Sequence, residues 1–172
     1  VYIPVNFTTK KVHPPHVFTR PELLSFFDKL DAFVPSSKGA KCRIWEYRAF
    51  FRILYCTGMR CGELLKMPVS EVDLVNGTMT IYKSKGHKDR VVYLSNDVWK
   101  LCTDYLKYIS NELGFEPFWL FPGRNPDEHM SYSSMNDNFN RFWNSTPYAE
   151  KVEKKPTVHS FRFTFVVDRM ND

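Results

Sequence analysis

The sequence predicts a mainly α-helical protein with one small antiparallel β-sheet, an α+β fold. Apolar residues recur at helical spacing through most of the chain, which is the pattern of amphipathic and buried helices. Residues 72–94 break this pattern with short β-branched runs, and they contain Asn76-Gly77, a strong signal for a β-hairpin. The 172 residues, 43% of them hydrophobic, are enough for one globular domain with a sizeable core.

The N-terminal segment differs from the rest of the chain. Residues 1–18 hold three prolines and no apolar period, so we expect a linker there, joining an upstream domain to one domain over residues 19–172. Thr19 and Glu22 have the spacing of a capping box. An i, i+3, i+4, i+7 stripe follows and predicts the first helix; its members are Leu23, Phe26, Phe27 and Leu30.

Two helices are expected on either side of a glycine turn. The segment "CRIWEYRAFFRILYCTGM" (42–59) predicts a mostly buried helix that ends at Gly58. Arg48 and Arg52 are four residues apart and are expected on its exposed edge. A short helix, "RCGELLKM", follows at once.

The predicted sheet has three antiparallel strands, at 72–75, 78–83 and 90–94. Asn76-Gly77 favours a two-residue type I′ turn between the first two strands. The segment "SKGHKD" supplies the second turn.

Three helices are expected after the sheet. Ser95 caps the first of them, and the second lies near 132–144. The last begins near Thr157, just after a proline, and runs towards the end of the chain. In that helix His159 and Arg162, three residues apart, would share one face.

Composition narrows the classes of protein without deciding the function. The formal net charge of +5 favours a polyanionic partner but does not require one. No run approaches the roughly 18 apolar residues needed to span a membrane, and the start of the chain lacks the pattern of a signal peptide. The four cysteines form no CxxC pair and no zinc-binding spacing. We therefore expect a reducing compartment, no disulfide, no metal and no cofactor.

Three clusters of residues are candidates for chemistry. Arg60 follows the glycine turn and has Glu63 three residues on, at a position where a guanidinium can grip a phosphate. A hairpin turn crowds four basic residues together: Lys83, Lys85, Lys88 and Arg90. The third cluster is His159 with Arg162. Each cluster also has an ordinary explanation, as a surface ion pair, a solvated turn or a coincidence of helical spacing.

Taken together, the clusters point to metal-free phosphoryl transfer. Arginines stabilise a charged transition state, and a lysine or a histidine can move the protons. The combination lacks a nucleophile.

The same clusters carry a family resemblance. "TGMRCGELLKM", "KSKGHKDRVVYL" and "HSFRFTF" resemble, in this order, the arginine box, the lysine β-hairpin and the His-x-x-Arg box of the tyrosine recombinases, also called phage-type integrases. The resemblance covers roughly residues 19–172. It implies the catalytic-domain fold of that family and a site-specific recombinase that cleaves and rejoins DNA strands through a 3′-phosphotyrosyl link, with no ATP or metal.

The resemblance also implies a role for each matching residue. Arg60 and Arg162 would clamp the scissile phosphate, and Glu63 would support the site. Lys85 would be the general acid for the 5′-hydroxyl leaving group, and His159 would assist proton transfer. Lys83 and Lys88 are rivals of Lys85 for the general-acid role. The other basic residues of the hairpin, with Arg124, would contact the DNA backbone; they are Lys83, Lys88 and Arg90.

Two departures from the family pattern are visible. Phe163 stands where the family usually has a second histidine, so we expect weakened activity or local repacking. All nine tyrosines precede His159, so none matches the family's nucleophile, which lies beyond the His-x-x-Arg box. We therefore expect a fragment cut before its nucleophile, which binds DNA without cleaving it.

The resemblance also sets expectations for partners and for rival functions. Partners would be double-stranded recombination sites and, in the intact protein, other copies in a tetramer on DNA; the fragment would be a monomer in solution. A prokaryotic cytosolic location follows. The main alternative is a regulator that binds DNA and has lost catalysis. A phosphoesterase that uses water, and a type IB topoisomerase, also remain open.

Overall fold

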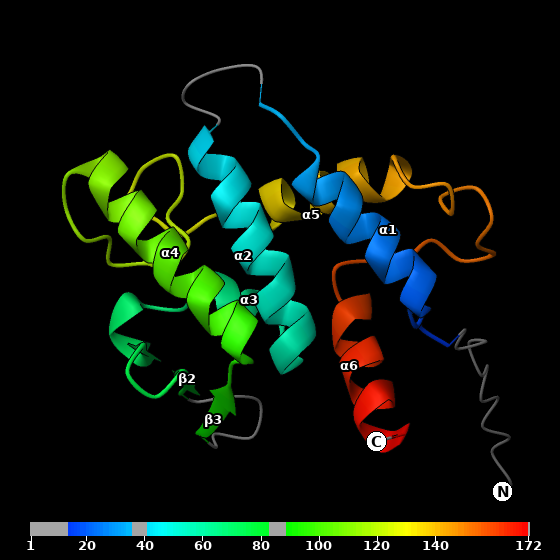
Figure 1. The fold of residues 1–172 in the computed structure, drawn as a ribbon, viewed down its shortest axis with the longest axis horizontal. Helices are drawn as coiled ribbons and strands as arrows, with labels where there is room; N and C mark the ends of the chain where they lie inside the picture. Colours follow the sequence, from blue (N-terminus) through cyan, green and yellow to red (C-terminus); the bar gives the residue numbers. More distant parts are fainter. Residues whose placement is uncertain (1–13, 36–40, 83–88, 172) are drawn as a thin grey trace, which may run out of the picture.

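The computed structural model describes residues 14–35, 41–82 and 89–171 (Figure 1). Its elements follow in the order α1 (Arg20–Asp31), α2 (Lys41–Thr57), α3 (Cys61–Leu65), the 3₁₀ helix η2 (Val69–Glu71), β1 (Val72–Asp73), β2 (Thr78–Ile81), β3 (Arg90–Tyr93), α4 (Asn96–Leu113), α5 (Tyr132–Asn144) and α6 (Ser160–Asn171). The predicted α+β class, mainly helical with one small antiparallel sheet, is confirmed. No helix among the described residues is long and apolar enough to cross a membrane.

Helix α2 is the central element of the fold. It packs against α4 on one side and against α1 and α6 on the other, while the sheet lies beside the start of α4 (Figure 1). Three fully buried aromatic rings join α1, α2 and α6: the centroid of Phe26 lies 5.3 Å from that of Phe51 and 5.4 Å from that of Phe161. Such pairs add about 0.5–1.5 kcal/mol each beyond their burial. The aromatic core thus fixes α6 against α2, which positions the site described below.

The predicted helix signals are largely confirmed. The amide of Thr19 donates to Glu22 Oε2 (2.7 Å) and the amide of Glu22 to Thr19 Oγ1 (3.4 Å), which completes the capping box of α1. Helix α4 starts after Ser95, but the Ser95 side chain makes no capping hydrogen bond, so that part of the prediction is wrong; the helix ends at Leu113, before Gly114, whose φ of 76° is left-handed. Arg48 and Arg52 are more exposed than the buried residues beside them on α2, as predicted for its exposed edge. Both are still half-buried, because backbone and carboxylate oxygens of Asp31, at the end of α1, accept their guanidinium N–H groups.

The sheet has the predicted order and direction, β1-β2-β3, all antiparallel. Its first turn differs from the prediction. Asp73 pairs with Thr78, so the loop spans residues 74–77 instead of two, and the first strand ends at Asp73. The reason is the Asp73 carboxylate, which accepts hydrogen bonds from the amides of Val75 (2.8 Å) and Asn76 (3.0 Å) and draws the chain out of the strand. The second strand ends at Ile81, and residues 83–88 lie outside the described residues.

Helix α6 begins later than predicted. Ser160 Oγ accepts a hydrogen bond from the amide of Thr157 (3.0 Å), and the Ser160 amide donates to the Thr157 carbonyl (2.8 Å). This local turn keeps residues 157–159 out of the helix, so His159 stands just before α6 and not within it. Deeper in the helix, Thr164 Oγ1 accepts from the amide of Phe18 (2.9 Å), which ties α6 to the segment before α1.

Candidate phosphate-binding site

A turn at Gly58 connects α2 to α3. Gly58 has a φ of 60°, in the left-handed region that favours glycine. Thr57 Oγ1 supports the turn, since it donates to the Ile53 carbonyl (2.7 Å) and accepts from the Met59 amide (3.3 Å). A Cβ at position 58 would lie 2.2 Å from Cδ1 of Phe165 on α6. The absence of a side chain therefore lets the turn and α6 approach closely.

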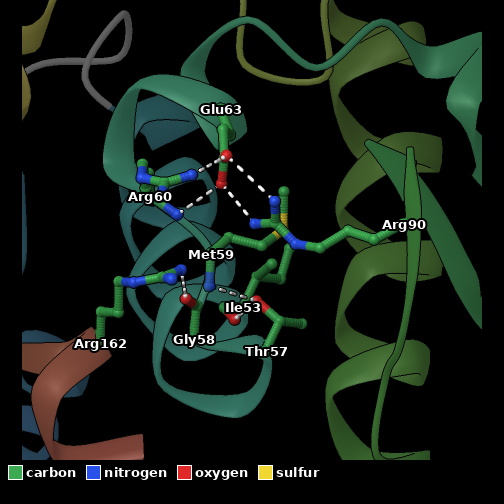
Figure 2. Close-up of polar contacts among 8 residues, drawn as sticks. All are labelled: Ile53, Thr57, Gly58, Met59, Arg60, Glu63, Arg90 and Arg162. Carbon is green, nitrogen blue, oxygen red and sulfur yellow. Dashed lines mark hydrogen bonds and ion pairs between the residues drawn. The ribbon is translucent and has the colours of Figure 1, made fainter. Parts of the chain in front are cut away.

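Arg60 stands at the start of α3 and is held by Glu63, as the spacing predicted. The Arg60 amide donates to Glu63 Oε2 (2.8 Å) and its Nη1 to Glu63 Oε1 (2.7 Å). Arg90, at the start of β3, reaches the same carboxylate with both Nη atoms, at 3.2 Å to Oε1 and 2.6 Å to Oε2 (Figure 2). Glu63 therefore joins the arginine box to the β-hairpin.

The electrostatics of Glu63 follow from these contacts. Burial alone would raise its pKa, but the hydrogen bonds from Arg90, and from the amide and guanidinium of Arg60, lower the pKa to about 2. Glu63 is therefore a carboxylate at any physiological pH. Its single charge is shared between two guanidinium groups, which leaves the pair with an excess of positive charge.

Arg162 brings a third guanidinium to this place from α6. Its Nη1 donates to the carbonyl oxygen of Gly58 at 2.5 Å, two residues before Arg60 (Figure 2). Burial, together with the positive charges of Arg60 and Arg90, lowers the pKa of Arg162. Arg162 thus lies close enough to Arg60, Arg90 and Glu63 to interact electrostatically with all three. Such crowding of positive charge around one carboxylate favours a bound anion.

His159 lies at the same place. Its side chain is exposed overall, and some desolvation together with the positive charges of Arg162 and Arg60 lowers its pKa from the ordinary value. At neutral pH the imidazole is therefore neutral and able to accept a proton. Its ring lies 4.9 Å from that of Phe163, edge to face at 89°. Phe163, the departure seen in the sequence, thus packs against His159 and limits its orientation.

Clefts lead to the arginines from two sides. One of about 410 Å³ is lined by Arg90, Arg162 and Arg169 together with Tyr93 and Phe165. Another, of about 560 Å³, is lined by residues in and next to α3 and β2, among them Arg60, Lys66, Thr80 and Tyr82. The guanidinium groups can therefore be reached by a ligand that passes over the surface.

The structure brings together five of the residues singled out in the sequence: Arg60, Glu63, Arg90, His159 and Arg162. Lys83, Lys85 and Lys88 lie outside the described residues; Arg90 places the strand that follows them beside Arg60. Arg124 is exposed and lines a different cleft, with Arg43 and His129. The bond between Arg90 and Glu63 was missed by sequence reasoning, because nothing in the spacing of residues 63 and 90 indicates it.

Comparison with known proteins gives consistent matches. A model described as "Phage integrase family" matches residues 22–171. Among curated proteins, tyrosine recombinase XerD of Rhizobium meliloti (strain 1021) is 37% identical over 82 residues, which are 48% of this chain and 26% of that protein. The crystal structure of XerH site-specific recombinase bound to difH substrate, a pre-cleavage complex, is 26% identical with a TM-score of 0.70 and covers 97% of this chain and 46% of that chain.

A second solved structure shows the same fold. The crystal structure of XerA recombinase has a TM-score of 0.69 at 22% identity, and the match covers 99% of this chain and 55% of that chain. The chain therefore spans about half the length of these solved proteins, and its match to the curated XerD spans about a quarter of that relative.

Proposed function

The chain belongs to the phage integrase family of tyrosine recombinases, and from this membership we propose that it is the catalytic domain of a site-specific DNA recombinase. The observation that carries the proposal is the convergence of Arg60 with Arg162 and neutral His159, which come from two segments of the chain about 100 residues apart. A phosphodiester matches this arrangement, because it offers two charged oxygens for guanidinium forks and an ester oxygen that needs a proton as it leaves.

In the proposed reaction a tyrosine hydroxyl attacks the scissile phosphorus and displaces the 5′-oxygen. The tyrosine is then joined to the DNA by a 3′-phosphotyrosyl bond. Arg60 and Arg162 stabilise the charge on the non-bridging oxygens. Lys85 donates a proton to the 5′-oxygen, and the neutral imidazole of His159 assists the transfer of the proton from the attacking hydroxyl. Glu63, locked by Arg90, holds Arg60 in place. Rejoining is the reverse, with a 5′-hydroxyl as the attacking group.

The rejoining half of this reaction can be tested without a tyrosine nucleophile. A nicked duplex that carries a 3′-p-nitrophenyl phosphate beside a free 5′-hydroxyl presents an aryl ester in place of the phosphotyrosine. We expect the 172-residue chain to join the strands with release of p-nitrophenolate. Arg60→Gln and Arg162→Gln are each expected to lower the rate by at least about 100-fold, the effect typical of losing one donor to a transition-state charge.

Arg52→Gln is the matched control, because Arg52 is bonded to Asp31 and lies away from the site. It is expected to join strands at the rate of the unaltered chain. The proposal is contradicted if the chain joins no strands, or if the Arg60→Gln and Arg162→Gln variants join them as fast as Arg52→Gln.

Cleavage distinguishes the proposal from its alternative, a regulator that only binds DNA. We propose that none of the nine tyrosines serves as the nucleophile, so this chain alone should form no covalent adduct with nicked DNA. Strand joining by the same chain favours the recombinase. DNA binding with neither activity favours the regulator. An adduct would instead assign the nucleophile to one of the nine tyrosines, which peptide mapping would identify.

Partners and location are part of the same proposal. The partners are double-stranded recombination sites and further copies of the protein; a lambda integrase with this fold forms a tetramer bound to a Holliday junction. We place the protein in the prokaryotic cytosol, which is consistent with bacterial relatives such as XerD of Rhizobium meliloti.

A further inference from the structure

A buried carboxyl group lies on α2, far along the helix from Gly58. Glu46 is 1% exposed, and its Oε2 accepts a hydrogen bond from Arg43 Nη1 at 2.7 Å. The same Nη1 donates to the carbonyl oxygen of Pro122 at 3.2 Å. Burial raises the pKa of Glu46 to about 7 even beside the arginine. The pair is therefore close to an even balance between the ionised and the protonated carboxyl at neutral pH.

Arg43 is not buried with its partner. Its side chain is 28% exposed and opens onto a cleft of about 730 Å³ between α2, the loop that follows Pro122, and α5. Arg124 lines the same cleft, is exposed, and makes no ion pair with any residue in the described part of the chain. Within the described residues, the guanidinium of Arg124 thus faces the cleft without an acidic partner. The guanidinium of Arg43 also faces the cleft, and its acidic partner is the buried Glu46.

We propose that this cleft is a second anion site, which takes a backbone phosphate of DNA between Arg43 and Arg124 while Glu46 gives up Arg43 and binds a proton from solvent. The proposal rests on the proposed function, because that function supplies the DNA. The proton balance is simple: one phosphate replaces one carboxylate at Arg43, and one proton neutralises the carboxylate left behind. No covalent bond changes.

The charges around Glu46 support this exchange. On α2 the charged or titratable neighbours are Arg43 and Tyr47. Three more groups line the cleft from the loop: Arg124, Glu128 and His129. On α5, Arg141 acts on Tyr47. Glu46 is the only carboxyl of this group that is buried, so it is the one for which neutralisation costs least.

The cleft lies on a part of the molecule that reaches the arginine site. It is closed on one side by Ser131 and Ser134, at the start of α5. Helix α5 packs against α3, and Tyr132 in its first turn lies close enough to Cys61 for the two groups to interact electrostatically. Cys61 directly follows Arg60. Helix α5 therefore connects the cleft to the chain beside Arg60.

The test is the pH dependence of DNA binding by the 172-residue chain, measured by fluorescence anisotropy on a labelled duplex at constant ionic strength. With a carboxyl pKa near 7, only about a tenth of the molecules have Glu46 protonated at pH 8. We therefore expect Glu46→Gln, which mimics the protonated acid, to bind roughly tenfold more tightly than the unaltered chain at pH 8 and equally well at pH 6.

A double variant isolates the arginine. Arg43→Gln combined with Glu46→Gln leaves no buried charge behind, so it tests the contact without the cost of an unpaired carboxylate. Relative to Glu46→Gln alone it should bind more weakly, with a salt dependence shallower by about one phosphate contact. His129→Gln should keep the pH dependence of the unaltered chain, which separates Glu46 from the histidine in the same cleft. Thermal unfolding confirms that each variant is folded.

The outcomes are separable. If the chain binds DNA but Glu46→Gln has the same affinity at pH 8 as the unaltered chain, the cleft proposal fails and the proposed function stands. It fails equally if the double variant matches Glu46→Gln in affinity and salt dependence. If the chain binds no duplex at any pH between 6 and 8, the proposed function fails, and the cleft proposal fails with it.

Discussion

Arg162 donates a hydrogen bond to the carbonyl oxygen of Gly58, across 104 residues of sequence. The acceptor is not a side chain but the backbone of the turn that leads into Arg60. The positions of Arg60 and Arg162 therefore both depend on the turn at Gly58, so that a shift of this turn moves both side chains.

Replacing Gly58 by alanine should destabilise the fold and disturb both arginines. A left-handed alanine costs about 1–2 kcal/mol, and its Cβ would overlap the ring of Phe165. We expect a loss of at least about 2 kcal/mol in the free energy of unfolding, measured in urea. Gly62→Ala is the control: nothing lies within 4 Å of its Cβ and it is inside α3, so its stability should be unchanged or higher. Equal effects at the two glycines would contradict the packing described.

The charge of Arg162 should be visible in the titration of His159. Removing it by Arg162→Gln takes away one of the causes that lower the histidine pKa, so the pKa should rise. The measurement is an NMR titration of the imidazole carbon resonances. Arg52→Gln, remote from the site, should leave the curve of His159 in place. A histidine that titrates identically in both variants would show that the two side chains do not interact.

Arg90 should control the acidity of Glu63. Its two hydrogen bonds favour the carboxylate, so Arg90→Met should raise the Glu63 pKa from about 2 by roughly one unit. Arg90→Lys should give a smaller rise, because an ammonium keeps the charge without the planar fork. The carboxyl carbon shift of Glu63 reports the titration. An unchanged midpoint in Arg90→Met would mean that the contact is not made in solution.

Glu46 should make stability depend on pH in an unusual direction for a carboxyl group. Its pKa is raised on folding from 4.5 to about 7, so the protonated form is favoured in the folded state. The unaltered chain should therefore lose stability as pH rises from about 4.5 through 7, by up to roughly 3 kcal/mol. Glu46→Gln should remove this slope, since its amide oxygen can still accept from Arg43. Parallel stability curves for the two proteins would contradict the burial of an ionisable carboxyl.

Much of the site was predictable because its signals are local. Arg60 and Glu63 are three residues apart, which places them on one face of a helix, and Gly58 indicates where that helix can begin. Their contact therefore follows from the spacing. The fold class was predictable for the same reason: capping residues and apolar stripes act within a few positions of each other, as at Thr19 and Glu22.

The missed features depend on contacts that no spacing encodes. Arg90 reaches Glu63 only after the sheet has packed beside α3. Asn76-Gly77 has the sequence of a tight hairpin, but the carboxylate of Asp73 captures the amides that the hairpin would have used. His159 lies outside the predicted helix because the Ser160 hydroxyl accepts from the amide of Thr157, and this turn delays the start of α6 to Ser160. In each case a specific side chain overrides a backbone preference.

The anchoring of α6 has a consequence for how the protein becomes active during synthesis. Arg162 meets Gly58, and Thr164 meets Phe18, only when the last helix has docked against elements made much earlier. Closing loops of this length is slow compared with forming a helix. A partly made chain with α2 and α3 already folded thus has one clamp arginine without the other. We expect the ability to bind a phosphate diester between both arginines to appear in a single step, when α6 docks against α2.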